Sequence, residues 1–221
     1  MTLTSSVYDQ IRTDIVSCLL EPGQKLRIEA LKARYGLGTS PIREALNRLS
    51  SERLVMQIDQ RGFIVAPVSL EDLKELTETR CMLYEVLLPR SLALGDQDWE
   101  EAIVLAQHRL LRTPWTIGDP PRLNPDARRA HRDFHRSLIA ASGAPMLIDL
   151  MDTLFDLTDR YRMVSQRSQE PLHRDTAAEH RAMADAVINR NVEDAIRLAQ
   201  AHIRETSERV TRHLTEKALA A

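Results

Sequence analysis

One stretch limits the fold of this chain more than any other. It runs from Tyr35 to Leu49 and reads YGLGTSPIREALNRL. Gly36 follows a helical run and suits the left-handed backbone that ends a helix. Ser40 is predicted to be the N-cap of the next helix, with Pro41 at the first helical position, where a missing N–H is harmless. A helix, a glycine turn and a second helix predict a helix-turn-helix.

The second helix of this motif has two faces of opposite character. Its apolar face is predicted to consist of Ile42, Ala45, Leu46 and Leu49. Its polar face is predicted to consist of Ser40, Arg43 and Asn47. A hydroxyl, a guanidinium and an amide in front of an apolar back suit docking in the major groove of DNA. The pattern also fits an ordinary amphipathic helix with a solvated face, because periodicity alone reports only burial.

The flanking segments complete a winged helix. A first helix is expected over residues 7–20, with its apolar face on Val7, Ile11, Ile15 and Leu19. Residues 21–24 form a turn, and a second helix covers residues 28–35. Two β-rich runs then follow at 55–58 and 63–66, with a glycine in the turn between them, as is typical of a hairpin. Arg61, at the tip of this wing, is expected to reach a minor groove or a phosphate.

Residues 7–68 resemble the DNA-binding domain of the GntR family of bacterial transcription regulators. The matching pieces are Leu20–Leu26, Ser40–Leu46, the run to Leu54–Val55, and Arg61–Phe63. In members of the fatty-acid regulator type, arginines that contact DNA replace Thr39 and Glu29, so only Arg43 and Gly62 carry over directly. The predicted DNA-binding set combines the motif with this resemblance and consists of Thr39, Ser40, Arg43, Asn47, Arg61 and Gly62.

The length and charge of the chain fit two domains, expected at 1–68 and 69–221. The net charge is −2, but residues 1–68 hold 9 Lys and Arg against 7 Asp and Glu, whereas residues 69–221 hold 21 against 25. Because the basic excess is small, DNA binding is expected to need two copies of the chain.

The rest of the composition points to a cytoplasmic protein. No signal peptide and no apolar run long enough to span a membrane are apparent in the sequence. Both cysteines, Cys18 and Cys81, lie in apolar helical contexts and are expected to be buried thiols of a reduced compartment.

Beyond residue 68 the pattern is helical throughout. Helices are expected at about 69–94, 98–112, 126–141, 145–165, 172–189 and 192–214, with a loop at 113–125. Pro89 predicts a kink or a local break in the first of these helices. The fold class is therefore mainly α: an N-terminal winged helix-turn-helix followed by an all-α helical bundle.

Four of the seven histidines have suggestive positions. His131 and His135 are four residues apart on one helix, so their rings project from the same face. His180 and His202 lie on two later helices, so that all four imidazoles can meet inside a bundle. Neutral imidazole suits Zn²⁺, Ni²⁺, Cu²⁺ or Fe²⁺. The alternative is a set of scattered surface or capped core histidines.

Residues 69–216 resemble the ligand-sensing FCD domain of the FadR branch of the GntR family. The matching residues are Phe134-His135, Leu138, Ser142-Gly143, Glu179-His180-Arg181 and His202-Ile203. The resemblance implies a divalent metal on His135, His180 and His202, and an all-histidine ligand set favours a late transition metal, Zn or Ni. His131 stands where the family usually has an aspartate or asparagine, and it is expected to be the fourth ligand. Arg80 matches a pocket-facing arginine of the family and is the candidate effector-binding residue; its alternative role is a surface salt bridge to Glu75, Glu78 or Glu85.

Taken together, these features predict a metabolite-responsive regulator that binds operator DNA as a homodimer. A small carboxylate effector, bound at the metal, is expected to relieve repression. Two alternatives remain: a constitutive regulator with a structural metal or none, and a metal-dependent enzyme. The enzyme is disfavoured because a catalytic role for the histidines leaves the winged helix without a function.

Overall fold

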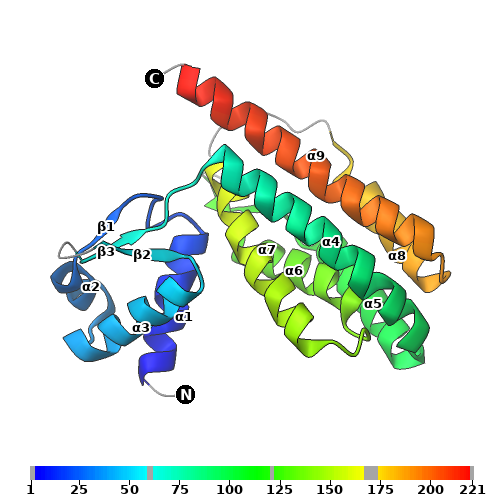
Figure 1. Ribbon diagram of the computed structural model, residues 1–221, viewed down its shortest axis with the longest axis horizontal. Coiled ribbons are helices and arrows are strands. Elements are labelled where there is room, and N and C mark those ends of the chain that lie inside the picture. The colour runs from blue at the N-terminus through cyan, green and yellow to red at the C-terminus, as the bar shows by residue number, and fades with distance from the viewer. Residues whose placement is uncertain (1–2, 59–61, 120–121, 167–173, 220–221) are drawn as a thin grey trace. The chain divides into compact units, whose positions relative to one another are not determined.

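The computed structural model describes residues 3–58, 62–119, 122–166 and 174–219 (Figure 1). Packing divides the chain into two compact units, one built from residues 1–76, 156–170 and 209–221, the other from residues 77–155 and 171–208. Within the described ranges, no helix is both long and apolar enough to cross a membrane. The predicted domain boundary after residue 68 stays a prediction.

The first unit contains a winged helix made of three helices and a small antiparallel sheet. The helices are α1 (Leu3–Val16), α2 (Ile28–Tyr35) and α3 (Thr39–Ser51), and the strands are β1 (Lys25–Leu26), β2 (Val55–Ile58) and β3 (Gly62–Val65). The strand order is β1-β3-β2, with Leu26 opposite Phe63 and Val55 opposite Val65. The predicted apolar face of α3 is confirmed, since all four of its residues are buried.

The first helix differs from its prediction. It begins at Leu3 and ends at Val16, instead of covering residues 7–20. Cys18 then takes a left-handed backbone with φ of 55°, which breaks the helical spacing. Consequently Leu19 is 61% exposed, although Val7, Ile11 and Ile15 are buried as predicted.

The turn before α3 confirms one expectation and corrects another. Gly36 ends α2 in the left-handed conformation, with φ of 68°, and its N–H donates to the carbonyl of Lys32. The N-cap of α3 is Gly38, so the assignment of Ser40 as N-cap is wrong. Helical backbone begins at Thr39, and Pro41 therefore sits within the first turn, where N–H groups have no partner inside the helix.

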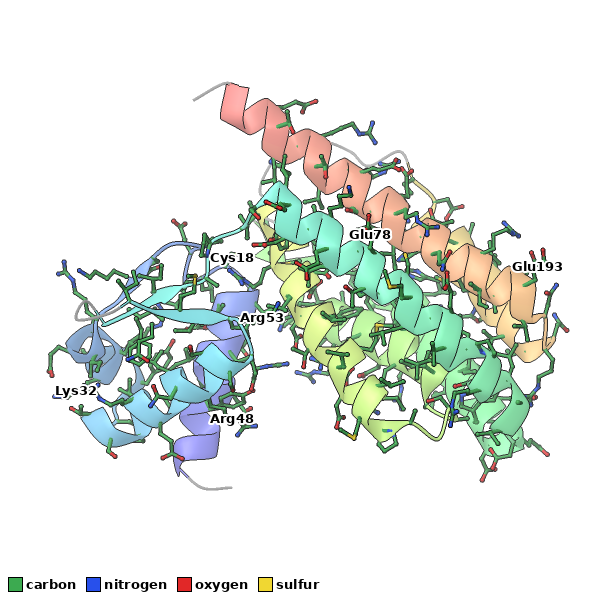
Figure 2. All side chains as sticks on the ribbon, viewed as in Figure 1. Cys18, Lys32, Arg48, Arg53, Glu78 and Glu193 are labelled. Carbon is green, nitrogen blue, oxygen red and sulfur yellow. The ribbon has the colours of Figure 1, made fainter. Side chains whose placement is uncertain are left out.

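The second unit is helical, and its longest helices continue into the first unit. The helices are α4 (Leu70–Leu94), α5 (Gln97–Arg112), α6 (Pro125–Ile139), α7 (Pro145–Gln166), α8 (Thr176–Ile188) and α9 (Val192–Leu219). Two hydrogen bonds show that helices α4 and α9 run antiparallel. The hydroxyl of Thr77 donates to that of Ser207, and the side-chain amide of Gln200 donates to the carbonyl of Cys81. Acidic side chains such as Glu78 on α4 and Glu193 on α9 are exposed (Figure 2).

Two details of this unit differ from the sequence-based expectation. Helix α4 continues through Pro89 as a single element, so no break occurs there. The loop between α5 and α6 contains a minimal hairpin, β4 (Thr116–Ile117) paired with β5 (Arg122–Leu123). Strands of two residues are too short to leave a period-2 pattern in the sequence.

Polar caps fix where the histidine-bearing helices begin. The side chain of Asn124 accepts from the N–H of Asp126 at the start of α6, and Asp175 accepts from the N–H of Ala178 at the start of α8. Asn191 accepts from the N–H of Asp194 at the start of α9. These caps thus set where α6, α8 and α9 begin.

Both cysteines are buried free thiols, as predicted.

Candidate metal centre and DNA-binding face

Four buried histidines converge inside the helical unit. His131 and His135 lie one turn apart on α6, His180 lies on α8 and His202 on α9. One ring nitrogen from each histidine lies within 4.8 Å of the corresponding atoms of the other three. The histidines are therefore not scattered over the surface, and the four rings form a cluster that could hold a metal ion. Whether they bind an ion or are capped core histidines is for experiment to decide.

The spacing of the cluster fits an ion of this class. Metal–nitrogen bonds of about 2.1 Å place neighbouring donor atoms about 3 Å apart around an octahedral ion and about 3.4 Å apart around a tetrahedral one. The Nε2 atoms of His131 and His135 are 3.2 Å apart, within that range. Opposed donors around an octahedral ion lie about 4.2 Å apart, so the two most distant donor atoms, at up to 4.8 Å, need to approach by only about 0.6 Å.

Two histidines of the cluster have their second nitrogen held by a neighbour. The hydroxyl of Tyr84 on α4 lies 3.1 Å from Nδ1 of His135. Burial raises the pKa of Tyr84 to about 12, so this hydroxyl stays neutral. Oε2 of Glu179 lies 2.7 Å from Nδ1 of His202. Such partners fix the tautomer and leave Nε2 of each ring available to a metal.

The carboxylate of Glu179 belongs to a network that the sequence did not predict. Arg174 pairs with Glu179 and also donates to the carbonyl of His202 and the hydroxyl of Thr206. Although burial opposes ionisation, hydrogen bonds from His202 and Arg174 lower the pKa of Glu179 to about 2. The contact of Glu179 with a histidine was not predicted, because Glu179 is adjacent to His180 and neighbouring residues on a helix point in different directions. Glu179 instead reaches the histidine of another helix.

An arginine and a phenylalanine border the cluster. The ring centroid of Phe155 on α7 lies 5.4 Å from that of His131 and 5.9 Å from that of His135. The guanidinium of Arg80 on α4 lies 5.1 Å from the centre of the Phe155 ring. Only 6% of Arg80 is exposed, so the alternative of a solvated surface salt bridge does not describe this residue.

The polar face of α3 is open to solvent. Thr39, Ser40, Arg43 and Asn47 are all exposed, and Gly62 begins β3 with a left-handed φ of 88°. Arg61 lies outside the described residues. The predicted DNA-binding residues on α3 therefore share one accessible surface, and their contact with DNA stays a prediction.

Comparison with known proteins decides the family. The model of the bacterial regulatory proteins of the gntR family matches residues 3–65, and the model of the FCD domain matches residues 75–205. The chain belongs to the GntR family. It is an FCD-type transcription regulator and not an enzyme.

Named relatives agree with this family, and a solved structure has a similar fold. The chain is 36% identical to the HTH-type transcriptional regulator BphR of Paraburkholderia xenovorans, over 91% of this chain and 82% of BphR. It is 33% identical to the HTH-type transcriptional repressor GlaR of Escherichia coli, over 92% of this chain and 94% of GlaR. The fold is similar to that of McbR/YncC of Escherichia coli, with a TM-score of 0.79 at 16% identity over 97% of this chain and 99% of that one.

Proposed function

We propose that this GntR-family regulator is a homodimeric repressor that leaves its operator when a small carboxylate binds a divalent metal in the FCD domain. The observation that carries the proposal is the convergence of His131, His135, His180 and His202, with donor nitrogens within 4.8 Å of one another. The repressor name of the relative GlaR supports repression as the mode of action.

The chemistry of the histidine cluster favours an anionic effector. Four neutral imidazoles add no negative charge, so a divalent ion among them stays electrophilic. Zinc and nickel both accept imidazole nitrogen. A six-coordinate ion on four histidines leaves two positions, which one carboxylate can fill. The buried guanidinium of Arg80, stacked on Phe155 beside the cluster, offers a second anchor for that anion.

The winged helix supplies the other half of the proposal. Two copies of α3, each presenting Thr39, Ser40, Arg43 and Asn47, would read two half-sites about 34 Å apart, one turn of DNA. Arg61 and Gly62 of the wing are proposed to contact the flanking backbone. If effector binding weakens DNA binding, DNA must weaken effector binding by the same factor. The site of action is the cytoplasm, where the operator is.

Metal analysis and DNA release test this proposal together. Full-length protein is purified without chelators, its metal content is measured by elemental mass spectrometry, and a duplex that it selects from a random pool is titrated with carboxylates. About one transition-metal ion per chain and release by at least one carboxylate would support the proposal. Absence of metal after incubation with zinc and with nickel would overturn the metal site. A bound ion with no carboxylate response would favour the constitutive regulator, in which the ion only braces the helices.

A further inference from the structure

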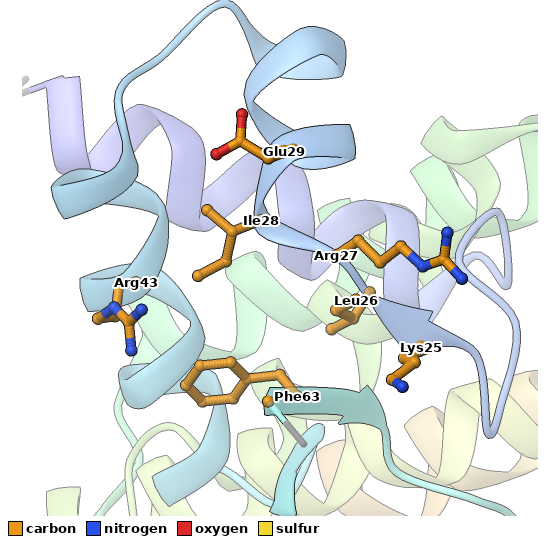
Figure 3. A pocket seen from close by; sticks show the side chains of 8 residues that line it. Lys25, Leu26, Arg27, Ile28, Glu29, Arg43 and Phe63 are labelled. Carbon is orange, nitrogen blue, oxygen red and sulfur yellow. The ribbon is translucent and has the colours of Figure 1, made fainter. Parts of the chain in front are cut away.

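A shallow pocket of about 370 Å³ lies in the winged helix, beside the polar face of α3. Its walls come from β1, the start of α2, one turn of α3 and the start of β3 (Figure 3). The lining residues are Lys25, Leu26, Arg27, Ile28, Glu29, Arg43, Gly62 and Phe63. Arg43 and Gly62 are also predicted DNA-binding residues, so the pocket opens on the surface proposed to meet DNA.

Unneutralised positive charge of the winged helix is concentrated at this pocket. Elsewhere in the described part of the winged helix, four basic side chains are paired with acids and Arg53 is not: the pairs are Arg12 with Glu52, Lys32 with Glu29, Arg34 with Asp14 and Arg48 with Glu52. Lys25, Arg27 and Arg43 have no acidic partner among the residues that the structure describes. The one carboxylate in the lining, that of Glu29, is already paired with Lys32 at 2.9 Å. The pocket rim therefore presents a net positive charge.

Arg27 occupies a position that helix stability does not explain. It is the N-cap of α2, and its side chain makes no capping hydrogen bond. Ser, Thr, Asp or Asn at an N-cap stabilises a helix by about 1 kcal/mol relative to residues that cannot cap. A positive charge there also opposes the helix dipole. Residues that break such local rules are expected at functional sites.

The floor of the pocket is apolar and lies between the basic groups. Leu26 and Phe63 are buried, at 4% and 3% exposure. In Figure 3, Ile28 and Phe63 lie between Arg43 on one side and Lys25 and Arg27 on the other. A DNA strand has the same alternation, because an apolar sugar face separates each charged phosphate from the next.

We propose that this pocket grips the DNA backbone next to the recognition helix. Lys25 and Arg27 bind one phosphate, and the adjoining deoxyribose packs on Ile28, the partly exposed residue of the apolar floor. This grip sets the register of α3 and leaves Arg43 to reach base edges in the groove. The inference rests on the proposed docking of α3 on DNA and adds a sequence-independent contact to it.

Salt titrations of the full chain test this contact. Wild type first selects a duplex from a random pool, and affinities for this duplex and for a scrambled duplex are then measured at several salt concentrations. Each lost phosphate contact lowers the slope of log affinity against log salt by about 0.9. Each variant alters this contact in both copies of the homodimer, so K25Q and R27Q are each expected to lower the slope by roughly 0.9 to 1.8. Both are also expected to weaken the two duplexes by a similar factor, roughly 10- to 60-fold at 0.1 M salt.

Two further variants separate the parts of the inference. The control is R53N. Arg53 is an exposed basic residue that lies outside the pocket lining and has no acidic partner in the described chain (Figure 2). Its backbone is left-handed, with φ of 59°, a conformation that asparagine tolerates. R53N is expected to leave the slope unchanged. I28A keeps every charge and should weaken both duplexes with no change in slope.

The outcomes distinguish this contact from DNA binding in general. If K25Q and R27Q change the slope no more than R53N, the backbone grip is wrong, while the proposed function stands. A loss of affinity in K25Q and R27Q that is restricted to the selected duplex would also overturn the backbone grip, because a phosphate contact carries no sequence information. Failure of the wild type to bind any duplex would overturn the proposed function itself, and this inference with it.

Discussion

Oε2 of Glu179 lies 2.7 Å from Nδ1 of His202, and Arg174 donates to both oxygens of the same carboxylate. The contact uses Nδ1 of His202 and leaves Nε2 available to an ion shared with the other three histidines. A carboxylate behind a metal-binding imidazole fixes its orientation and increases its basicity. Glu179 is therefore expected to act on the metal through His202.

Replacement of Glu179 is expected to weaken metal binding without removing a ligand. E179A should lower the affinity for zinc or nickel by about 10- to 100-fold, the usual effect of losing such a partner. E179Q should lose less, because its amide oxygen can still accept from Nδ1. Competition with a chromogenic chelator measures both affinities. The control is E193Q on the exposed surface of α9, and equal affinities for E179A and E193Q would contradict the role of Glu179.

Loss of one metal ligand is expected to abolish the effector response of the helical domain and to leave DNA binding by the winged helix intact. H180A should abolish stoichiometric metal binding and the response to carboxylates, while binding to the selected duplex stays within about twofold of wild type, because His180 is remote in sequence from the winged helix. H108A, on the exposed face of α5, is the matched control. Metal content and DNA titration in the presence of carboxylate measure the two effects. A normal carboxylate response of H180A would mean that the effector binds elsewhere.

Arg80 is expected to bind the effector without binding the metal. R80M keeps a long apolar stem against Phe155 but removes the guanidinium. The variant should therefore retain one ion per chain and require at least 10-fold more carboxylate for DNA release, since a charge-assisted hydrogen bond contributes about 1.5–3 kcal/mol. Isothermal titration with the active carboxylate measures this loss. An unchanged dissociation constant would mean that Arg80 packs against Phe155 and does not bind the effector.

Local patterns in the sequence were sufficient for most of the fold. The apolar spacing of Ile42, Ala45, Leu46 and Leu49 predicted the buried face of α3, and the i,i+4 spacing of His131 and His135 placed both rings on one side of α6. These predictions succeeded because each depends on the period of a single helix. The convergence of His180 and His202 on that pair was expected from the family resemblance, since packing between helices is not visible in local periodicity.

The features that the sequence did not predict have physical causes that local periodicity does not report. The end of α1 depended on the left-handed backbone of Cys18, a conformation that few residues other than glycine adopt and that the sequence does not announce. The bond between Glu179 and His202 joins two helices, and the two-residue strands β4 and β5 are too short to leave a pattern. Each of these features depends on tertiary contacts or on one unusual backbone angle.

Arg43 is expected to carry sequence preference. R43A should weaken binding to the selected duplex by about 1–3 kcal/mol, and it should weaken binding to a scrambled duplex much less, because a contact to a base edge discriminates whereas a phosphate contact does not. Fluorescence anisotropy at one fixed salt concentration measures both affinities. Equal losses on the two duplexes would assign Arg43 to the DNA backbone instead.

Ionisation of Tyr8 is expected to lower the stability of the folded winged helix at alkaline pH. Its hydroxyl donates to Oε1 of Glu52 at 2.5 Å, and Arg48 lies over its ring at 3.9 Å. Burial, followed by the bond to Glu52, raises the pKa of Tyr8 from 10.0 to about 12. Since the unfolded chain ionises first, this group stabilises the folded state below pH 10 and loses that contribution as the pH rises towards 12.

Y8F isolates this contribution because it removes only the hydroxyl. Near neutral pH the variant should be less stable than wild type by about 1 kcal/mol, the usual value of one hydrogen bond. Between pH 10 and 12 wild type alone loses the stabilisation from Tyr8, so the difference in unfolding midpoint should shrink as the pH rises. Urea titrations followed by circular dichroism measure the midpoints at each pH. A difference that stays constant up to pH 12 would mean that Tyr8 ionises at the same pH in both states, and that its bond to Glu52 does not favour the neutral phenol.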